Sequence, residues 1–204
     1  MLKYIHTTWL HVILAILALF LDGGIAFQFA GILFQLPISA SPYLCLLVLL
    51  MPVLSGTSKN QVRMRWSYGV AMLVGLIYDI TYIGIIGISF IGFPLTVWVT
   101  ANIKKFFANT MSWALATWFL SLTFFLIYDY LAFGIINMAN VSVPSFIIFH
   151  LFPTLLVNLI LFFMFYGMLD YLYRSTRQLD VTSYSMEGHE LDVTMPLRRR
   201  TRKY

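Results

Sequence analysis

The sequence has few charged residues and a single cysteine. Asp, Glu, Lys and Arg make up 10% of its 204 residues, where about 25% is usual in soluble domains. One cysteine, Cys45, excludes a disulfide-bonded scaffold and a thiolate metal cluster, because both need several sulfur atoms held close together. We expect Cys45 to be a small core residue. So little charge is not compatible with an ordinary soluble domain.

Hydrophobic residues are correspondingly abundant, at 60% of the chain. A helix that crosses the roughly 30 Å hydrocarbon core needs about 20 apolar residues, so the apolar material suffices for about six crossings. We therefore predict an all-α integral membrane protein with six transmembrane helices. The predicted spans are residues 9–21, 42–54, 66–82, 85–103, 111–133 and 144–173. The apolar residues 25–43, interrupted by prolines, are expected to form a helix at the membrane interface.

The Lys and Arg residues occur in short groups between the spans, at Lys3, at 59–65, at 104–105 and in the tail. With six spans all these groups lie on one side of the membrane, which predicts cytoplasmic termini because cytoplasmic loops are rich in Lys and Arg. This topology also explains the net charge of +5 without nucleic acid. The chain divides into a transmembrane domain, residues 1–173, and a short basic cytoplasmic tail, residues 174–204, which we expect to be disordered.

The tail carries a cluster of basic residues close to its end. Its members are Arg198, Arg199, Arg200, Arg202 and Lys203. Near the inner leaflet each positive charge contributes about 1 kcal/mol toward binding anionic lipid. Two interpretations stay open: the cluster binds anionic lipid or an acidic cytoplasmic partner, or it only orients and solubilises the tail.

Three aspartates, Asp22, Asp79 and Asp129, lie at the outer ends of the odd-numbered spans. The sequence Tyr-Asp-x4-Gly-Ile-Ile occurs at residues 78–86 and again at 128–136, which predicts that the third and fifth spans meet the outer surface in similar ways. The carboxylates are either solvated at the headgroup level, where a charge costs much less than the ~3 kcal/mol at the bilayer centre, or they contact a partner's extracellular segment.

The even-numbered spans each contain a proline near the middle: Pro52, Pro94 and Pro153. A proline lacks an N–H and its ring clashes with the preceding turn, so it bends a helix and frees a carbonyl for another partner. We therefore expect three helical hairpins, each pairing an acid-tipped helix with a kinked one.

A polar stripe accompanies the last proline, because His150, Thr154 and Asn158 are spaced i, i+4 and i+8 on one helix face. Hydrogen bonds between helices are one interpretation, and a groove for a small molecule or a partner is the other. His150 and Asn158, the prolines Pro94 and Pro153 and the three outer aspartates are the candidate partner-binding or helix-packing residues.

Catalytic motifs are absent from the sequence. Asp79 and Asp129 resemble the two carboxylates of aspartyl intramembrane proteases, which share one proton, but the matching Gly-x-Gly-Asp is missing. No nucleophile and base pattern, His-x3-His pair, P-loop or dinucleotide fingerprint is present. We therefore predict that the protein is not an enzyme and has no catalytic residue, cofactor or metal site.

Several segments together resemble the bacterial rod shape-determining protein MreD. They are Phe-Leu-Asp-Gly at 20–23, Gly-Leu-Ile-Tyr-Asp-Ile at 75–80, Gly-Ile-Ile-Gly-Ile at 84–88, Phe-Pro-Leu at 93–95 and His-Leu-Phe-Pro-Thr-Leu-Leu-Val-Asn-Leu-Ile at 150–160. The resemblance covers roughly residues 8–172. The long basic tail departs from the short ends typical of the family.

The resemblance implies a subunit of the cell-elongation machinery in the bacterial inner membrane. Its partners would be MreC, the actin-like MreB, the glycosyltransferase RodA and a class B penicillin-binding transpeptidase, and its role would be to organise lateral peptidoglycan synthesis. The alternative is the substrate-binding membrane subunit of an energy-coupling-factor vitamin transporter, which is similar in size and helix number. Such subunits dock through an Ala-x3-Ala patch, whereas Ala26 and Ala30 have this spacing on the wrong side of the membrane.

Overall fold

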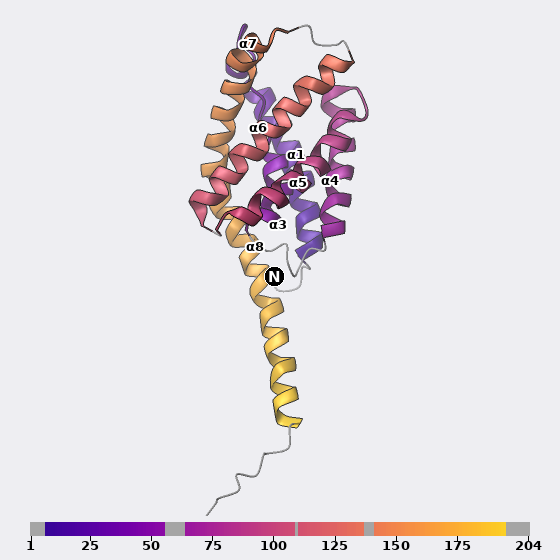
Figure 1. The fold of residues 1–204 in the computed structure, drawn as a ribbon, viewed down its shortest axis with the longest axis vertical. Helices are drawn as coiled ribbons and strands as arrows, with labels where there is room; N and C mark the ends of the chain where they lie inside the picture. The colour runs from indigo at the N-terminus through magenta and orange to yellow at the C-terminus, as the bar shows by residue number, and fades with distance from the viewer. Residues whose placement is uncertain (1–6, 56–63, 109, 137–140, 195–204) are drawn as a thin grey trace, which may run out of the picture.

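The computed structural model describes residues 7–55, 64–108, 110–136 and 141–194 (Figure 1). These residues form helices and connecting segments, with no strand among them, which confirms the all-α class. The α-helices are α1 (Thr7–Gln28), α2 (Ala30–Leu33), α3 (Leu44–Leu54), α4 (Met64–Tyr78), α5 (Ile88–Ile103), α6 (Met111–Ile135), α7 (Val143–Phe146) and α8 (Phe152–Thr194). Two π-helical turns, η3 (Asp79–Ile83) and η5 (Ile147–Leu151), and a 3-10 turn, η4 (Lys104–Phe106), adjoin them.

Four helical stretches are long and apolar enough to cross a membrane. They are Trp9–Gln28, Trp66–Ile83, Met111–Ile135 and Val143–Tyr173. The helices α3 and α5 have 11 and 16 residues, fewer than the about 20 that a crossing needs. The long apolar helices identify a membrane protein, whereas six complete crossings stay a prediction.

Helix α3 forms the centre of the bundle. All of its residues are buried, including Cys45, which is a core residue as predicted. It contacts α1, α4, α5, α6 and α8, so protein surrounds it. Its uniformly apolar sequence is compatible with this position, because a helix that is hydrophobic on every side belongs in a protein core or in a membrane.

Two of the three expected hairpin pairs pack closely: α1 with α3 and α4 with α5. Gly75 permits the approach of α4 to α5, because a Cβ at this position would overlap the carbonyl oxygen of Ser89 and lie 2.7 Å from its carbonyl carbon. Helix α6 crosses the bundle obliquely (Figure 1) and packs more against α5 than against α8. The arrangement of three hairpins therefore stays a prediction.

Residues 25–43 differ from the expected interfacial helix. Helix α1 continues to Gln28, α2 is a single turn, and residues 34–43 are not helical. Pro37 and Pro42 disfavour helical backbone at the residues before them. Near its end the segment passes into the protein, where Ala40 and Tyr43 are buried. In membrane proteins non-helical backbone is tolerated where it is buried in protein.

The prediction that the repeated Tyr-Asp segments meet the outer surface alike is wrong. In the first copy Asp79 begins the π-helical turn η3, and Gly84, which follows it, has a left-handed φ of 77°. In the second copy Gly134 lies inside regular α6, which continues to Ile135. The first copy must reverse the chain within a few residues to enter α5, and this requires the positive φ that glycine adopts readily.

The expectation that the tail is disordered is also partly wrong. Helix α8 continues to Thr194 and extends beyond the bundle (Figure 1). Nucleation is the costly step of helix formation, so a helix already formed inside the bundle propagates easily into residues 174–194. The basic cluster 198–203 lies outside the described residues.

Candidate functional site

Asp22 of α1 is buried and holds the start of α3. Its Oδ1 accepts a hydrogen bond from the Leu44 N–H at 2.6 Å, and its Oδ2 accepts one from the Cys45 N–H at 2.8 Å. The residue before α3, Tyr43, makes no side-chain capping bond. Asp22 lies on another helix, yet it accepts hydrogen bonds from the N–H groups that a local Ser, Thr or Asp ordinarily caps. Its negative charge also stabilises the positive end of the α3 dipole.

Asp79 has the same relation to α5. Its Oδ1 accepts the Ser89 N–H at 2.7 Å, and its Oδ2 accepts the N–H groups of Gly87 at 2.7 Å and Phe90 at 3.1 Å. The local N-cap position of α5 is Gly87, which has no side chain to supply a capping bond. Asp79 thus closes the reversal between α4 and α5 and caps the second helix of the pair.

The two carboxylates are therefore engaged inside the chain. The expectation that water solvates them at the headgroup level is wrong, because Asp22 is 3% exposed and Asp79 is 0% exposed. Hydrogen bonds to an ionised acceptor are short and about twice as strong as neutral ones. The structure accordingly places Asp22 and Asp79 as residues that fix the packing of neighbouring helices.

The polar stripe of α8 and η5 binds backbone of the segment 34–43. His150 Nδ1 lies 2.9 Å from the Ser39 carbonyl oxygen, and Thr154 Oγ1 accepts the Ser41 N–H at 3.3 Å. Asn158 accepts the Tyr43 N–H at 2.7 Å and donates to the Ser41 carbonyl at 2.8 Å. The stripe therefore pairs with an irregular segment of the same chain, whereas the sequence suggested a neighbouring helix.

The spacing of this contact follows from backbone geometry. Four residues of helix rise about 6.0 Å, and two residues of extended chain rise about 6.6 Å. Positions i, i+4 and i+8 on the helix therefore stay level with Ser39, Ser41 and Tyr43. Buried backbone groups need partners, and the stripe provides them where no second strand is present.

Pro153 adds one further contact to the same segment. It has no N–H to donate to the carbonyl of Phe149, four residues earlier. That carbonyl oxygen instead accepts the Ser39 N–H at 2.8 Å. The expected release of a carbonyl is thus observed at this proline. Pro94 lies inside α5 and is half-buried, and the kinks themselves stay predictions.

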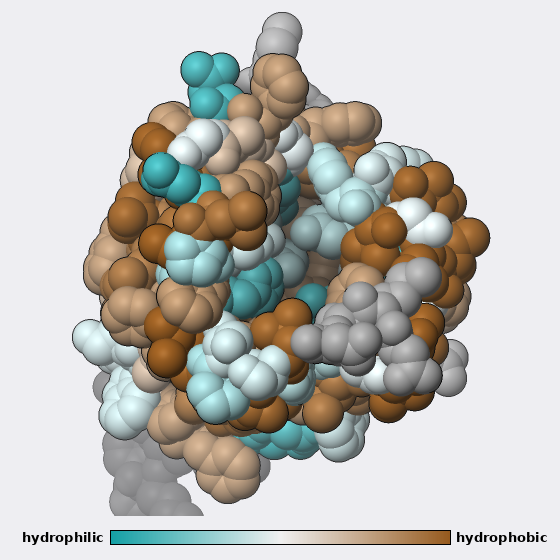
Figure 2. Space-filling view, turned by 90° about the horizontal axis from the view of Figure 1, so that it is seen from above, coloured by the Kyte–Doolittle hydropathy of each residue, from teal (hydrophilic) through white to brown (hydrophobic). Residues whose placement is uncertain are grey.

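A pocket of about 320 Å³ lies at the end of the bundle opposite the α8 extension. Seen from above, the molecule has polar residues within a hollow that apolar residues surround (Figure 2). The lining comes from α1, the segment 34–43, α4, η3, α6 and η5. The residues are Asp22, Ala26, Phe34, Ser41, Pro42, Tyr43, Tyr78, Tyr82, Ile83, Phe125, Asp129, Phe133 and His150.

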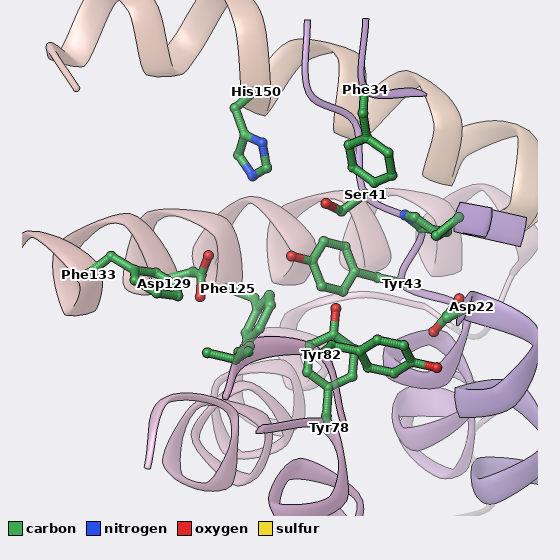
Figure 3. A pocket seen from close by; sticks show the side chains of 13 residues that line it. Asp22, Phe34, Ser41, Tyr43, Tyr78, Tyr82, Phe125, Asp129, Phe133 and His150 are labelled. Atoms are coloured by element: carbon green, nitrogen blue, oxygen red, sulfur yellow. The ribbon is translucent and has the colours of Figure 1, made fainter. Parts of the chain in front are cut away.

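Asp129 is the pocket carboxylate for which the described residues provide no hydrogen-bond donor. It lies on α6 and is half-buried (Figure 3). Among the described residues none donates a hydrogen bond to its carboxylate or forms an ion pair with it, in contrast to Asp22 and Asp79. The three aspartates, alike in sequence position, thus divide into two structural caps and one carboxylate that faces a cavity.

The tyrosines of the pocket were not among the predicted site residues. Tyr43 and Tyr78 stack with ring centroids 6.2 Å apart, and Tyr82 packs on Tyr78 at 4.9 Å. The Tyr82 hydroxyl donates to the Leu19 carbonyl at 2.8 Å, which ties η3 to α1. The Tyr residues that precede Asp79 and Asp129 were the available signal for an aromatic site. That repeat did not indicate that Tyr43 packs beside Tyr78.

Two further pairs of polar side chains connect helices of the bundle. His11 Nδ1 lies 2.6 Å from the Tyr173 hydroxyl and links α1 to α8. Thr100 Oγ1 lies 2.8 Å from Ser121 Oγ and links α5 to α6. Within the part of the chain that the structure describes, no group of three His, Cys, Asp or Glu residues is placed to hold a metal ion.

Comparison with curated proteins and with solved structures gives no match. Comparison with protein families gives one that covers most of the chain, residues 4–176, and it is the family described as rod shape-determining protein MreD. The match includes both capping aspartates, the polar stripe and every residue of the pocket, and it ends where α8 leaves the bundle. The chain therefore belongs to the MreD family and has a role in rod shape determination.

Proposed function

We propose that the protein is a non-enzymatic membrane subunit of the cell-elongation complex, which organises lateral peptidoglycan synthesis with MreC and MreB. The family match over residues 4–176 carries this proposal. RodA and a class B penicillin-binding transpeptidase are the proposed further partners. The effect of such a subunit is a shift in the conformational populations of its partners, produced by contacts that differ between their states.

The proposed topology has six crossings in the inner membrane, with both termini in the cytoplasm. The distribution of Lys and Arg supports it. Helix α3 and the buried part of the segment 34–43 together provide the second crossing, and α5 with η4 provides the fourth. This arrangement directs the pocket to the cell exterior and the α8 extension to the cytoplasm.

The absence of catalysis is likewise a proposal, supported by the state of the carboxylates. An aspartyl protease needs two carboxylates that share one proton. Both oxygens of Asp79 accept backbone N–H groups, so they are not free to share a proton with Asp129. The vitamin-transporter alternative receives no support from the family comparison.

Among the candidate residues we propose different contributions to partner binding. Asp22, Asp79 and Asn158 act indirectly, by fixing helices and the buried segment in place. Asp129 and His150 line the outward pocket and are the candidates for direct contact. For the basic cluster 198–203, outside the described residues, binding of anionic lipid or of an acidic cytoplasmic partner stays a proposal.

The test is affinity purification of the full chain from detergent-solubilised membranes, followed by identification of the co-purifying proteins. We expect MreC among them and expect depletion of the protein to convert rods to round cells. Retention of rod shape after complete depletion would contradict the proposed function. A membrane-protein bait of similar abundance controls for nonspecific recovery.

A further inference from the structure

We propose that the outward pocket binds an organic cation, with a primary ammonium or guanidinium head beside Asp129 and an apolar stem among the aromatic rings. The proposal rests on the juxtaposition of an unpaired carboxylate with a cage of tyrosine and phenylalanine side chains (Figure 3). It goes beyond a role in rod shape, because it names the chemical class that the pocket recognises.

In its ionised form Asp129 lacks a counterpart among the described residues. A carboxylate partly withdrawn from water is stabilised by an opposite charge or by hydrogen-bond donors. Asp22 and Asp79 obtain donors from helix N-termini, whereas no described residue supplies a donor or a cation to Asp129. The pocket therefore has one acceptor with unused capacity, and it faces the cavity.

The Lys and Arg side chains that the structure describes do not provide the missing cation. Of the Lys and Arg side chains that the structure describes, Lys104 donates to the Ala108 carbonyl and Lys105 donates to Asn102. Both lie after α5, at the opposite end of the bundle from the pocket. We therefore take a ligand from outside the chain as the source of the positive charge.

The walls of the pocket favour an organic cation over a metal ion. Tyr43 and Phe125 meet edge to face at 5.3 Å, and Phe34 and Phe133 complete the aromatic lining. Aromatic faces attract ammonium and guanidinium groups and also accept an apolar stem. Hard metal ions instead need several oxygen ligands, and the described lining has too few that are free.

His150 supplies a second acceptor. Its Nδ1 lies 2.9 Å from the Ser39 carbonyl oxygen, which only accepts, so Nδ1 carries the proton in the neutral ring. The Nε2 atom is then the acceptor nitrogen of a ring that lines the pocket. The pocket lining therefore contains two acceptors for a cationic head, a carboxylate and an imidazole nitrogen.

The direct test is equilibrium dialysis of the purified full chain in detergent against labelled n-butylammonium, the analogue of a lysine side chain. We expect saturable binding that n-butylguanidinium displaces and neutral n-butanol does not. Asp129→Asn should weaken binding roughly thirtyfold. Asp180→Asn is the matched control, because it makes the same change in charge about 45 Å along the helix from His150, and it should bind like the original protein.

Folding of the variants is measured separately, by thermal unfolding without ligand. If Asp129→Asn does not fold, Phe133→Leu replaces it and should weaken binding severalfold by removing one aromatic face. Absence of saturable binding, equal binding of n-butanol, or equal binding by a folded Asp129→Asn variant would each overturn the proposal.

The cation has two possible sources, a free amine and a Lys or Arg side chain of a partner. Recovery of MreC with the affinity-tagged chain, measured with and without saturating n-butylammonium, separates them. If n-butylammonium reduces the recovery of MreC, the site binds a partner's side chain, and this outcome rests on the proposed function. If recovery is unchanged and binding of n-butylammonium is saturable, the site binds a free amine. Dialysis with the purified chain does not depend on the elongation complex, so the two proposals fail independently.

Discussion

Replacement of Asp79 by Asn changes the cap of α5 and tests the structural role of the outer aspartates. The carboxylate accepts three N–H groups, whereas the amide has a single acceptor oxygen. That oxygen retains two bonds at most, so at least one buried N–H loses its partner, at about 1–3 kcal/mol. Loss of the charge weakens the retained bonds and removes up to ~1 kcal/mol of interaction with the helix dipole. The expected destabilisation is about 3 kcal/mol.

The assay is thermal unfolding of the purified variant in detergent, combined with hydrogen exchange at the start of α5. For a chain of this length about 3 kcal/mol lowers Tm by roughly 6–12 °C. The amide of Ser89, which bonds Oδ1, should exchange faster. Asp129→Asn is the matched comparison, and we expect no loss of stability, because its carboxylate accepts no bond from the described residues. Equal effects of the two substitutions would refute the distinction between them.

Three further predictions concern packing, the polar stripe and the tail. Gly75→Ala should destabilise α4 against α5 by about 1–3 kcal/mol, while Gly69→Ala in the same helix, where a Cβ meets nothing within 4 Å, should not lower Tm. Asn158→Leu should destabilise the protein by about 2–4 kcal/mol, because it removes the partners of one buried and one part-buried backbone group. Leu156→Ala, at a side chain that is 46% exposed, should destabilise it less. Equal losses of Tm would contradict the proposed contact. Truncation after Tyr173 should leave membrane insertion unchanged, because the inner loops orient the helices. A mixed orientation of the truncated chain in a protease-protection assay would contradict this prediction.

The helical class of the fold was predictable from the sequence because it depends on local information. Apolar runs of about 20 residues leave few alternatives to membrane helices. The path of the irregular segment 34–43 was harder to predict, because its hydrogen bonds come from residues more than a hundred positions away, as in the contact of Tyr43 with Asn158. Spacing predicted a stripe on α8, but it contained no information about what the stripe contacts.

The outer aspartates show the same limit. Their position near helix ends was readable from the sequence, and their division into two caps and one pocket residue was not. Asp22 and Asp79 each cap the helix that begins after the next connection, so their roles depend on how that connection folds. The repeat around Asp79 and Asp129 was misleading, because the same residues form a tight reversal in one copy and regular helix in the other.

The orientation of the pocket is the central claim, and cysteine labelling in intact cells tests it most directly. Gly134 is exposed near the pocket end of α6, and Lys105 is exposed at the opposite end of the bundle. The native Cys45 is 0% exposed and should not react. We predict that a membrane-impermeant maleimide labels Gly134→Cys in intact cells and labels Lys105→Cys only after permeabilisation. Labelling of Lys105→Cys from outside, with Gly134→Cys protected, would contradict the account.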